Sequence, residues 1–162
     1  MTPERVAALI AAAGTTIEAE VGGIGDEVAS WHPAEGEWCV KEVLAHLLIC
    51  ERLGFAGRIR EILAEDNPSL KATGPADRAC ENDLAAMLAA VAAQRAASVD
   101  LVRSLRPADL ERAGIHERVG RLTVNDLIHE WVHHDRAHLK QIYSNLQAHV
   151  WPDMGGAQAF VR

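Results

Sequence analysis

Residues 123–149 read TVNDLIHEWVHHDRAHLKQIYSNLQAH, and their apolar positions recur at helical spacing. With about 100° of rotation per residue, the apolar side chains fall on one side of a helix, around Trp131. Those side chains are Val124, Leu127, Ile128, Ile142 and Leu146. Thr123, followed three residues later by Asp126, resembles a capping box with Asp in place of Glu. The segment therefore predicts a long amphipathic helix that ends near His149.

Three further segments have the same periodicity. One spans residues 2–20 and begins with a Thr-Pro-Glu cap, and a second spans residues 40–64. The third, rich in Ala, Leu and Val, runs from about residue 77 to residue 104, just before an Arg-Pro pair. The connection at residues 106–122 looks irregular, with one short helical turn at residues 108–112, and contains no convincing strand. The sequence predicts an all-α fold, a four-helix bundle.

The composition agrees with a single domain over residues 1–162. Hydrophobic residues make up 49% of the chain and charged residues 24%, which suffices for one core without disulfides. The chain has 23 acidic and 16 basic residues and no run of Lys or Arg, so we do not expect nucleic acid as a partner. No run approaches the roughly 20 apolar residues of a membrane span. Three cysteines without a CxxC pair suit a reducing cytoplasm.

Two overlapping pairs of histidines offer rival metal sites on the last helix. Residues 129–133 match H-E-x-x-H, the zinc motif of metalloproteases, while His134 and His138 form a second pair one turn apart. His134 and His138 fall within about 60° of Trp131, on the apolar side, whereas positions 129 and 133 lie about 160° away. No glutamate follows position 130 to complete a protease site. The pattern favours the pair His134 and His138.

A third histidine is the candidate for completing this site. His46 lies in VLAHLLIC, residues 43–50, an otherwise apolar run of the second helix. Buried imidazoles need hydrogen-bond partners, and each histidine could be an ordinary core residue that has them. A divalent ion would satisfy all three rings at once and leave positions for water or substrate. We predict a mononuclear metal site formed by His46, His134 and His138.

Residues beside the predicted ligands have two interpretations each. Asp135 can orient a ligand imidazole, or it can form a surface salt bridge with Arg136 or Lys140. Trp131 packs beside the site as core or as a pocket wall, with core favoured.

Four residues of the second helix leave similar alternatives. Cys50 can line the site or simply pack, with packing favoured. Glu42, one turn before His46, is a polar lip of the site or an ordinary solvated side chain. Arg52 and Arg58 can meet an acidic group of a substrate, although charges on a long helix are usually solvated.

Two motifs resemble those of the DinB-like (DinB/YfiT) family of metalloenzymes. Residues 38–46 fit W-x-x-x-E-x-x-x-H, and residues 134–141 fit H-x-x-x-H-x-x-Q. The element order resembles that family over nearly the whole chain. The resemblance implies a four-helix bundle, a homodimer, and a nickel, zinc or other divalent ion held by His46, His134 and His138, with water completing the shell.

The activity implied by the resemblance is less uniform. Family members include bacillithiol transferases and mycothiol-dependent maleylpyruvate isomerase, which use low-molecular-weight thiols. The first expectation is therefore a thiol-dependent S-transferase acting on a small-molecule substrate. The second is a metal-dependent hydrolase, and the third is a non-catalytic metal-binding stress protein, because a fold does not fix its function.

Overall fold

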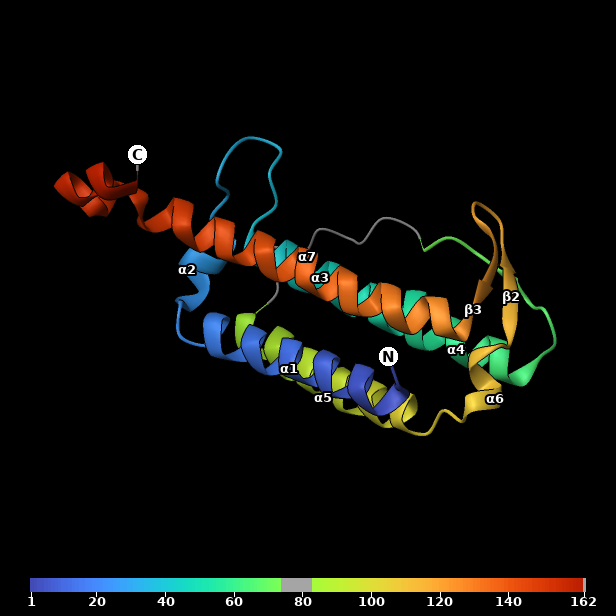
Figure 1. The fold of residues 1–162 in the computed structure, drawn as a ribbon. Helices are drawn as coiled ribbons and strands as arrows, with labels where there is room; N and C mark the ends of the chain where they lie inside the picture. The colour runs from blue at the N-terminus through green and yellow to red at the C-terminus, as the bar shows by residue number, and fades with distance from the viewer. Residues whose placement is uncertain (74–82, 162) are drawn as a thin grey trace.

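The structure is a computed structural model that describes residues 1–73 and 83–161 (Figure 1). It is mostly helical. Three long helices are α1 (Pro3–Val21), α5 (Leu84–Arg103) and α7 (Val124–Val150). A fourth long element begins with α3 (Val40–Ile49) and continues through further helical segments. The shorter helices are α2 (Gly25–Ser30), α4 (Ala56–Ala64), α6 (Pro107–Leu110) and the C-terminal 3-10 segment η2 (Trp151–Val161).

These helices pack as a closed four-membered bundle. α1 lies against α5 and α7, and α3 lies against the same two helices (Figure 1). α3, a π-helical segment η1 (Cys50–Phe55) and α4 form one rod that serves as the second member. The predicted four-helix bundle is confirmed.

The ends of the helices follow local sequence signals. The Thr123 hydroxyl accepts a hydrogen bond from the Asp126 backbone N–H at 3.0 Å, and the Asp126 carboxylate accepts one from the Thr123 N–H at 2.9 Å. This is the predicted capping box of α7. Asp83 caps α5, accepting from the Ala86 N–H at 2.8 Å. The start predicted near Asp77 lies outside the described residues.

Two helical details differ from the prediction. The segment 40–64, predicted as one α-helix, is interrupted by the six π-helical residues of η1. A π-helix shifts hydrogen bonds from i+4 to i+5 without changing which residue types are present, so apolar periodicity does not reveal it. The short helix α2, in a stretch with two Gly residues before it, was also not predicted.

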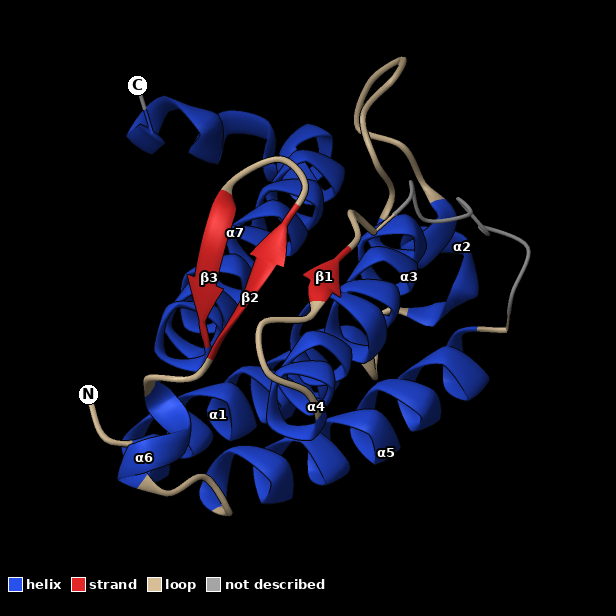
Figure 2. Ribbon diagram, turned by 90° about the vertical axis from the view of Figure 1, so that its right-hand side faces the viewer, coloured by secondary structure: helices blue, strands red, loops and turns tan. Residues whose placement is uncertain are grey.

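The expectation that the chain has no strand is wrong. A small sheet of β1 (Ser69–Leu70), β2 (Ala113–His116) and β3 (Gly120–Thr123) lies beside α4 and the start of α7 (Figure 2). β1 pairs with β2 in parallel, and β2 pairs with β3 in antiparallel register. Gly120 has a φ of 77° at the turn between β2 and β3, a conformation that favours glycine. Strands of two to four residues are too short to show a period.

The apolar core has two parts with polar side chains between them. The part near the sheet includes Ile59 and Trp131, and the other includes Ile17 and Leu44. Along α5 and α7, polar residues lie between the two apolar parts. The buried polar side chains at this level are Glu51, Arg95, Ser98 and Asp135.

α5 is long and apolar enough to cross a membrane by length and composition alone. The sequence analysis did not expect a run of this kind. In the structure, α5 packs against α1 and α3, and its Arg95 is buried in ion pairs. A core helix of a bundle meets the same criterion, so this helix is explained by its place in the fold.

Candidate metal centre

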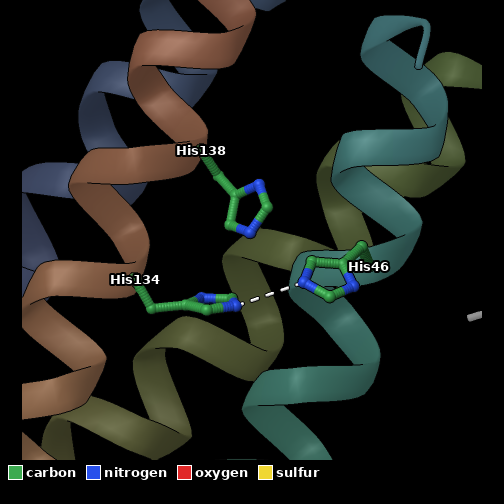
Figure 3. A group of neighbouring side chains, drawn as sticks. All are labelled: His46, His134 and His138. Atoms are coloured by element: carbon green, nitrogen blue, oxygen red, sulfur yellow. Dashed lines mark hydrogen bonds between the residues drawn. The ribbon is translucent and has the colours of Figure 1, made fainter. Parts of the chain in front are cut away.

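The structure brings His46, His134 and His138 together between α3 and α7. One ring nitrogen from each histidine lies within 4.8 Å of the others, and the three side chains converge (Figure 3). His46 Nε2 and His134 Nε2 are 3.2 Å apart. The ring centroids of His134 and His138, one turn apart on α7, are separated by 4.4 Å. The geometry is that of three nitrogen ligands aimed at one point.

Aromatic rings enclose the three histidines. Trp38, in the loop before α3, lies parallel to His138 at 6.3 Å between centroids, and tilted against His46 at 5.1 Å. Phe55 of η1 meets His134 edge-on at 5.2 Å. The histidines themselves are half-buried. They are therefore shielded on some sides and still reachable by water or a small molecule.

All three imidazoles are held in the neutral form. The pKa of His134 is lowered from 6.5 to about 3, mainly by burial and in part by the positive charges that His138 and His46 would carry. Burial also lowers the pKa of His46, with a smaller contribution from His138. For His138, burial lowers the pKa, although its hydrogen bond with Gln141 opposes this. Neutral imidazoles are the form that binds metal.

The hydrogen bonds around the rings test whether an ion fits here. Gln141 Oε1 lies 3.0 Å from His138 Nδ1, and because an amide oxygen only accepts, Nδ1 carries the hydrogen and Nε2 keeps a free lone pair. His134 Nδ1 is buried with no hydrogen-bond partner among the described residues. The free lone pair of His138 Nε2, and the approach of His46 Nε2 to His134 Nε2, fit a ligand set for a borderline divalent ion such as zinc or nickel.

Cys50 lines this site. Its Sγ lies 3.5 Å from His46 Nε2, one turn further along the rod. Burial raises the pKa of the Cys50 thiol, and Arg58 opposes that rise. The favoured prediction for Cys50 was packing alone, but its sulfur faces a histidine.

Glu42 does not form a lip of the site, and it is not solvated. The side chain is buried and accepts a hydrogen bond from the Cys39 backbone N–H at 2.9 Å, which caps α3. Its other contact is His32, at 3.1 Å. Glu42 therefore fixes the start of the helix that presents His46. The sequence signal for this role is an acidic residue three positions after the cap.

Asp135 points away from the three histidines. It is 1% exposed and forms a buried ion pair with Arg95 of α5, instead of a surface pair with Arg136 or Lys140. Arg95 also pairs with Glu51 of η1 at 2.9 Å.

Arg95 and Glu51 were not predicted as functional or structural partners. Arg95 looks like a solvated residue in an Ala-rich helix, but a Cβ on Gly14 would lie 2.9 Å from its side chain. That glycine gives the arginine room to enter the bundle. The Arg95 guanidinium also donates a hydrogen bond to the Ile10 carbonyl at 3.0 Å.

Trp131 and the two histidines of the H-E-x-x-H motif lie outside the group of three ligands. Trp131 is a core residue, 1% exposed and stacked on Phe55 at 5.0 Å. His133 is exposed, as the helical periodicity predicts. His129 is half-buried instead of facing solvent, because it contacts the Asn125 carbonyl and the amino group of Met1. The H-E-x-x-H pair therefore does not converge on the site.

Comparison with known proteins identifies the family and the fold. The family model of the DinB superfamily matches residues 9–142. The chain belongs to the DinB superfamily. A solved structure similar to this DinB superfamily member is YfiT from Bacillus subtilis, with a TM-score of 0.75 and 18% identity. The match covers 88% of this chain and 85% of the other.

YfiT is described as a probable metal-dependent hydrolase with an unusual four-helix bundle topology. At 18% identity the likeness to YfiT shows the fold that both chains share. No curated protein matches this chain.

Proposed function

We propose that this DinB superfamily member is a metal-dependent hydrolase whose divalent ion is held by His46, His134 and His138. The observation that carries the proposal is the convergence of three neutral imidazoles within 4.8 Å. Structural zinc sites use four protein ligands, whereas three ligands leave a position open for a reacting group. The similarity to YfiT supports hydrolysis as the reaction class.

The chain's own residues prepare the ligands. Gln141 holds His138 in the tautomer that presents Nε2, and Trp38 limits how far the His46 and His138 rings can turn. Glu42 holds the start of α3, and with it His46. A divalent ion in such a site lowers the pKa of a coordinated water or thiol and so supplies a nucleophile near neutral pH.

Thiol-dependent S-transfer is the alternative, because the same ligands suit activation of a low-molecular-weight thiol. It was the first expectation from the resemblance, and we keep it as a second proposal. Nickel or zinc as the ion, a homodimer and a cytoplasmic location stay predictions. A non-catalytic metal-binding protein is the outcome if the ion binds and neither reaction occurs.

Metal content is the first test. The protein is purified without a histidine tag, and bound metals are quantified by elemental mass spectrometry after incubation with nickel or zinc. We expect about one ion per chain in the wild type and none in His46→Ala or His138→Ala. His129→Ala is the matched control, because its ring lies outside the site, and it should keep the ion.

Two results would contradict the site. One is loss of metal in His129→Ala with retention in His46→Ala, and the other is absence of metal from every form. Activity is then measured on the metal-loaded protein with activated aryl esters, with and without a low-molecular-weight thiol, and with an aryl halide plus thiol. Ester hydrolysis that needs no thiol supports the hydrolase, and conjugation of the aryl halide supports S-transfer.

A further inference from the structure

A second polar cluster lies along the same rod as His46, beyond Cys50. Arg58 of α4 donates a hydrogen bond through Nη2 to the Lys71 carbonyl at 2.9 Å. The same Nη2 lies 3.1 Å from Nε2 of His116, a residue of β2 that is 7% exposed. The rod and the small sheet thus meet at an arginine and a buried histidine.

Two donors face the ring of His116, one at each nitrogen. The Arg118 backbone N–H lies 3.2 Å from Nδ1, and Arg58 Nη2 lies 3.1 Å from Nε2. A neutral imidazole accepts at one nitrogen only, and both neighbours can only donate. One of the two donors is therefore left without an acceptor at this ring. It is Arg58 when Nδ1 accepts from Arg118, and Nε2 then carries the hydrogen.

A third donor at the same place is also unsatisfied. Arg58 Nε is buried and has no hydrogen-bond partner among the described residues. Buried polar groups are nearly always paired, and leaving donors unpaired costs free energy. An oxyanion that accepts from Arg58 and from His116 Nε2–H would satisfy these groups together. Arginine suits this role because its planar fork matches the oxygens of a carboxylate or phosphate.

The cluster is adjacent to the candidate metal centre. A Cβ placed on Gly54 would lie 3.9 Å from Cys50 Cβ and 4.0 Å from Arg58 Nη1. Gly54 has no side chain there, so Arg58 and Cys50 flank the same bare stretch of η1. Cys50 Sγ in turn lies 3.5 Å from His46 Nε2. Cys50 therefore lies between His46 and Arg58 along one side of the rod.

The surroundings of Arg58 favour an anion of modest size. Arg58 lines a hollow of 360 Å³ together with Lys71, Thr73 and Glu61, so two cations and one carboxylate border it. The nearby carboxylate of Glu117 is held by the Ala72 backbone N–H at 3.0 Å. Arg52, the other arginine proposed from sequence, is exposed and lines a different hollow, next to α5. Of the two arginines proposed from sequence, Arg58 lies at this hollow and Arg52 does not.

We propose that Arg58 and His116 form an oxyanion subsite that binds a carboxylate or phosphate group of the substrate. The subsite deepens the proposed function and rests on it, because it gives the small-molecule substrate of the metal centre an anionic end. Arg58 donates through its guanidinium, and His116 donates through Nε2–H.

Anion binding tests the subsite without any turnover. The probes are acetate and inorganic phosphate, titrated at constant ionic strength against chloride, and the readout is the ¹⁵N shift of the His116 side chain. The titration uses zinc-loaded wild type and the metal-free His134→Ala variant, because phosphate can also bind a metal ion. We expect saturable binding in both proteins. Saturation by acetate alone indicates a carboxylate, and saturation by phosphate alone indicates a phosphate ester.

Variants assign the binding to Arg58. Arg58→Gln should weaken binding at least tenfold, and Arg58→Lys should fall between it and the wild type because it keeps the charge without the fork. Arg60→Gln is the matched control, since Arg60 is an exposed arginine on the same helix. If Arg58→Gln fails to fold, His116→Ala takes its place. We then measure how far the anion raises the melting temperature, and the rise should be smaller in His116→Ala than in the wild type.

The proposal is overturned if neither anion binds the wild type, or if Arg58→Gln and Arg60→Gln bind equally well. An unreduced shift in a folded His116→Ala also overturns it. Metal content, measured on the same samples, separates the two proposals. Anion binding without metal binding would refute only the proposed function, and metal binding without anion binding would refute only the subsite.

Discussion

His134 and Asp135 are neighbours in the chain, yet they belong to two unlike polar clusters on adjoining faces of α7, about 100° apart. His134 joins a half-buried group of neutral rings and keeps a nitrogen with no hydrogen-bond partner among the described residues. Asp135 joins a buried group of formal charges, in which Arg95 lies between it and Glu51. The first group is open and incomplete, whereas the ion pairs of the second bind α5 to α7 and to η1.

The difference between the clusters indicates their roles. A buried ion pair recovers its desolvation cost only through close partners, so such a cluster fixes how helices pack. Neutral rings with an unsatisfied nitrogen do not stabilise the fold in that way. We therefore assign the histidines to ligand binding and the ion cluster to holding η1, α5 and α7 in place. The predictions below test this division.

The largest effect is expected for Asp135→Ala. Removing Asp135 leaves Glu51 as the carboxylate paired with buried Arg95, but takes the acceptor from two guanidinium nitrogens, and the free energy of unfolding should fall by about 3 kcal/mol. Urea unfolding followed by circular dichroism measures the change. Asp100→Ala is the control, because Asp100 is exposed on α5 and its loss should change stability by less than about 0.5 kcal/mol. A stable Asp135→Ala that loses its metal would show that the two clusters work as one.

A smaller effect, on metal affinity, is expected for Gln141→Leu. Without the amide oxygen, His138 loses the hydrogen bond that fixes its tautomer, and affinity for zinc should fall by about 10- to 100-fold. Competition with a chromophoric chelator measures the affinity, and the exposed Gln147→Leu serves as the control. Unchanged affinity would mean that His138 is held by Trp38 alone.

The effect that is smallest near neutral pH is a pH dependence of the metal-free protein. The pKa of His134 is lowered to about 3 in the folded state. As the pH falls below 6.5, the unfolded chain therefore binds a proton at this histidine before the folded chain does. Stability present above pH 6.5 should be lost towards pH 3, with a slope of at most about 1.4 kcal/mol per pH unit from this group. Urea unfolding at several pH values measures the slope. His134→Gln should flatten it, whereas exposed His133→Gln should not.

The sequence predicted those parts of the fold that show a period or a cap. Apolar spacing located α7 and placed His134 and His138 on the side facing α3, and the Thr123–Asp126 pair predicted where α7 begins. The strands were missed because Ala113–His116 and Gly120–Thr123 are too short for alternation to appear. Their pairing depends on contacts between residues distant in the chain.

The charged partners of the bundle were harder to predict. Arg95 is surrounded in sequence by alanines, which suggests a solvated arginine, and only the packed structure shows that it meets Glu51 and Asp135. Which charges become buried is decided by the packing of three helices at once. The same holds for Arg58 and His116, which are 58 residues apart in the chain.

The π-helical segment η1 sets the rotational phase of the rod. At about 100° per residue, an uninterrupted α-helix would turn Arg58 about 120° away from the direction of His46. The wider turn of η1 accommodates about one extra residue, which removes about 100° of that rotation and brings Arg58 back towards the histidine side. Deleting Leu53 would keep every side chain discussed above and still turn Arg58 out of line with His46.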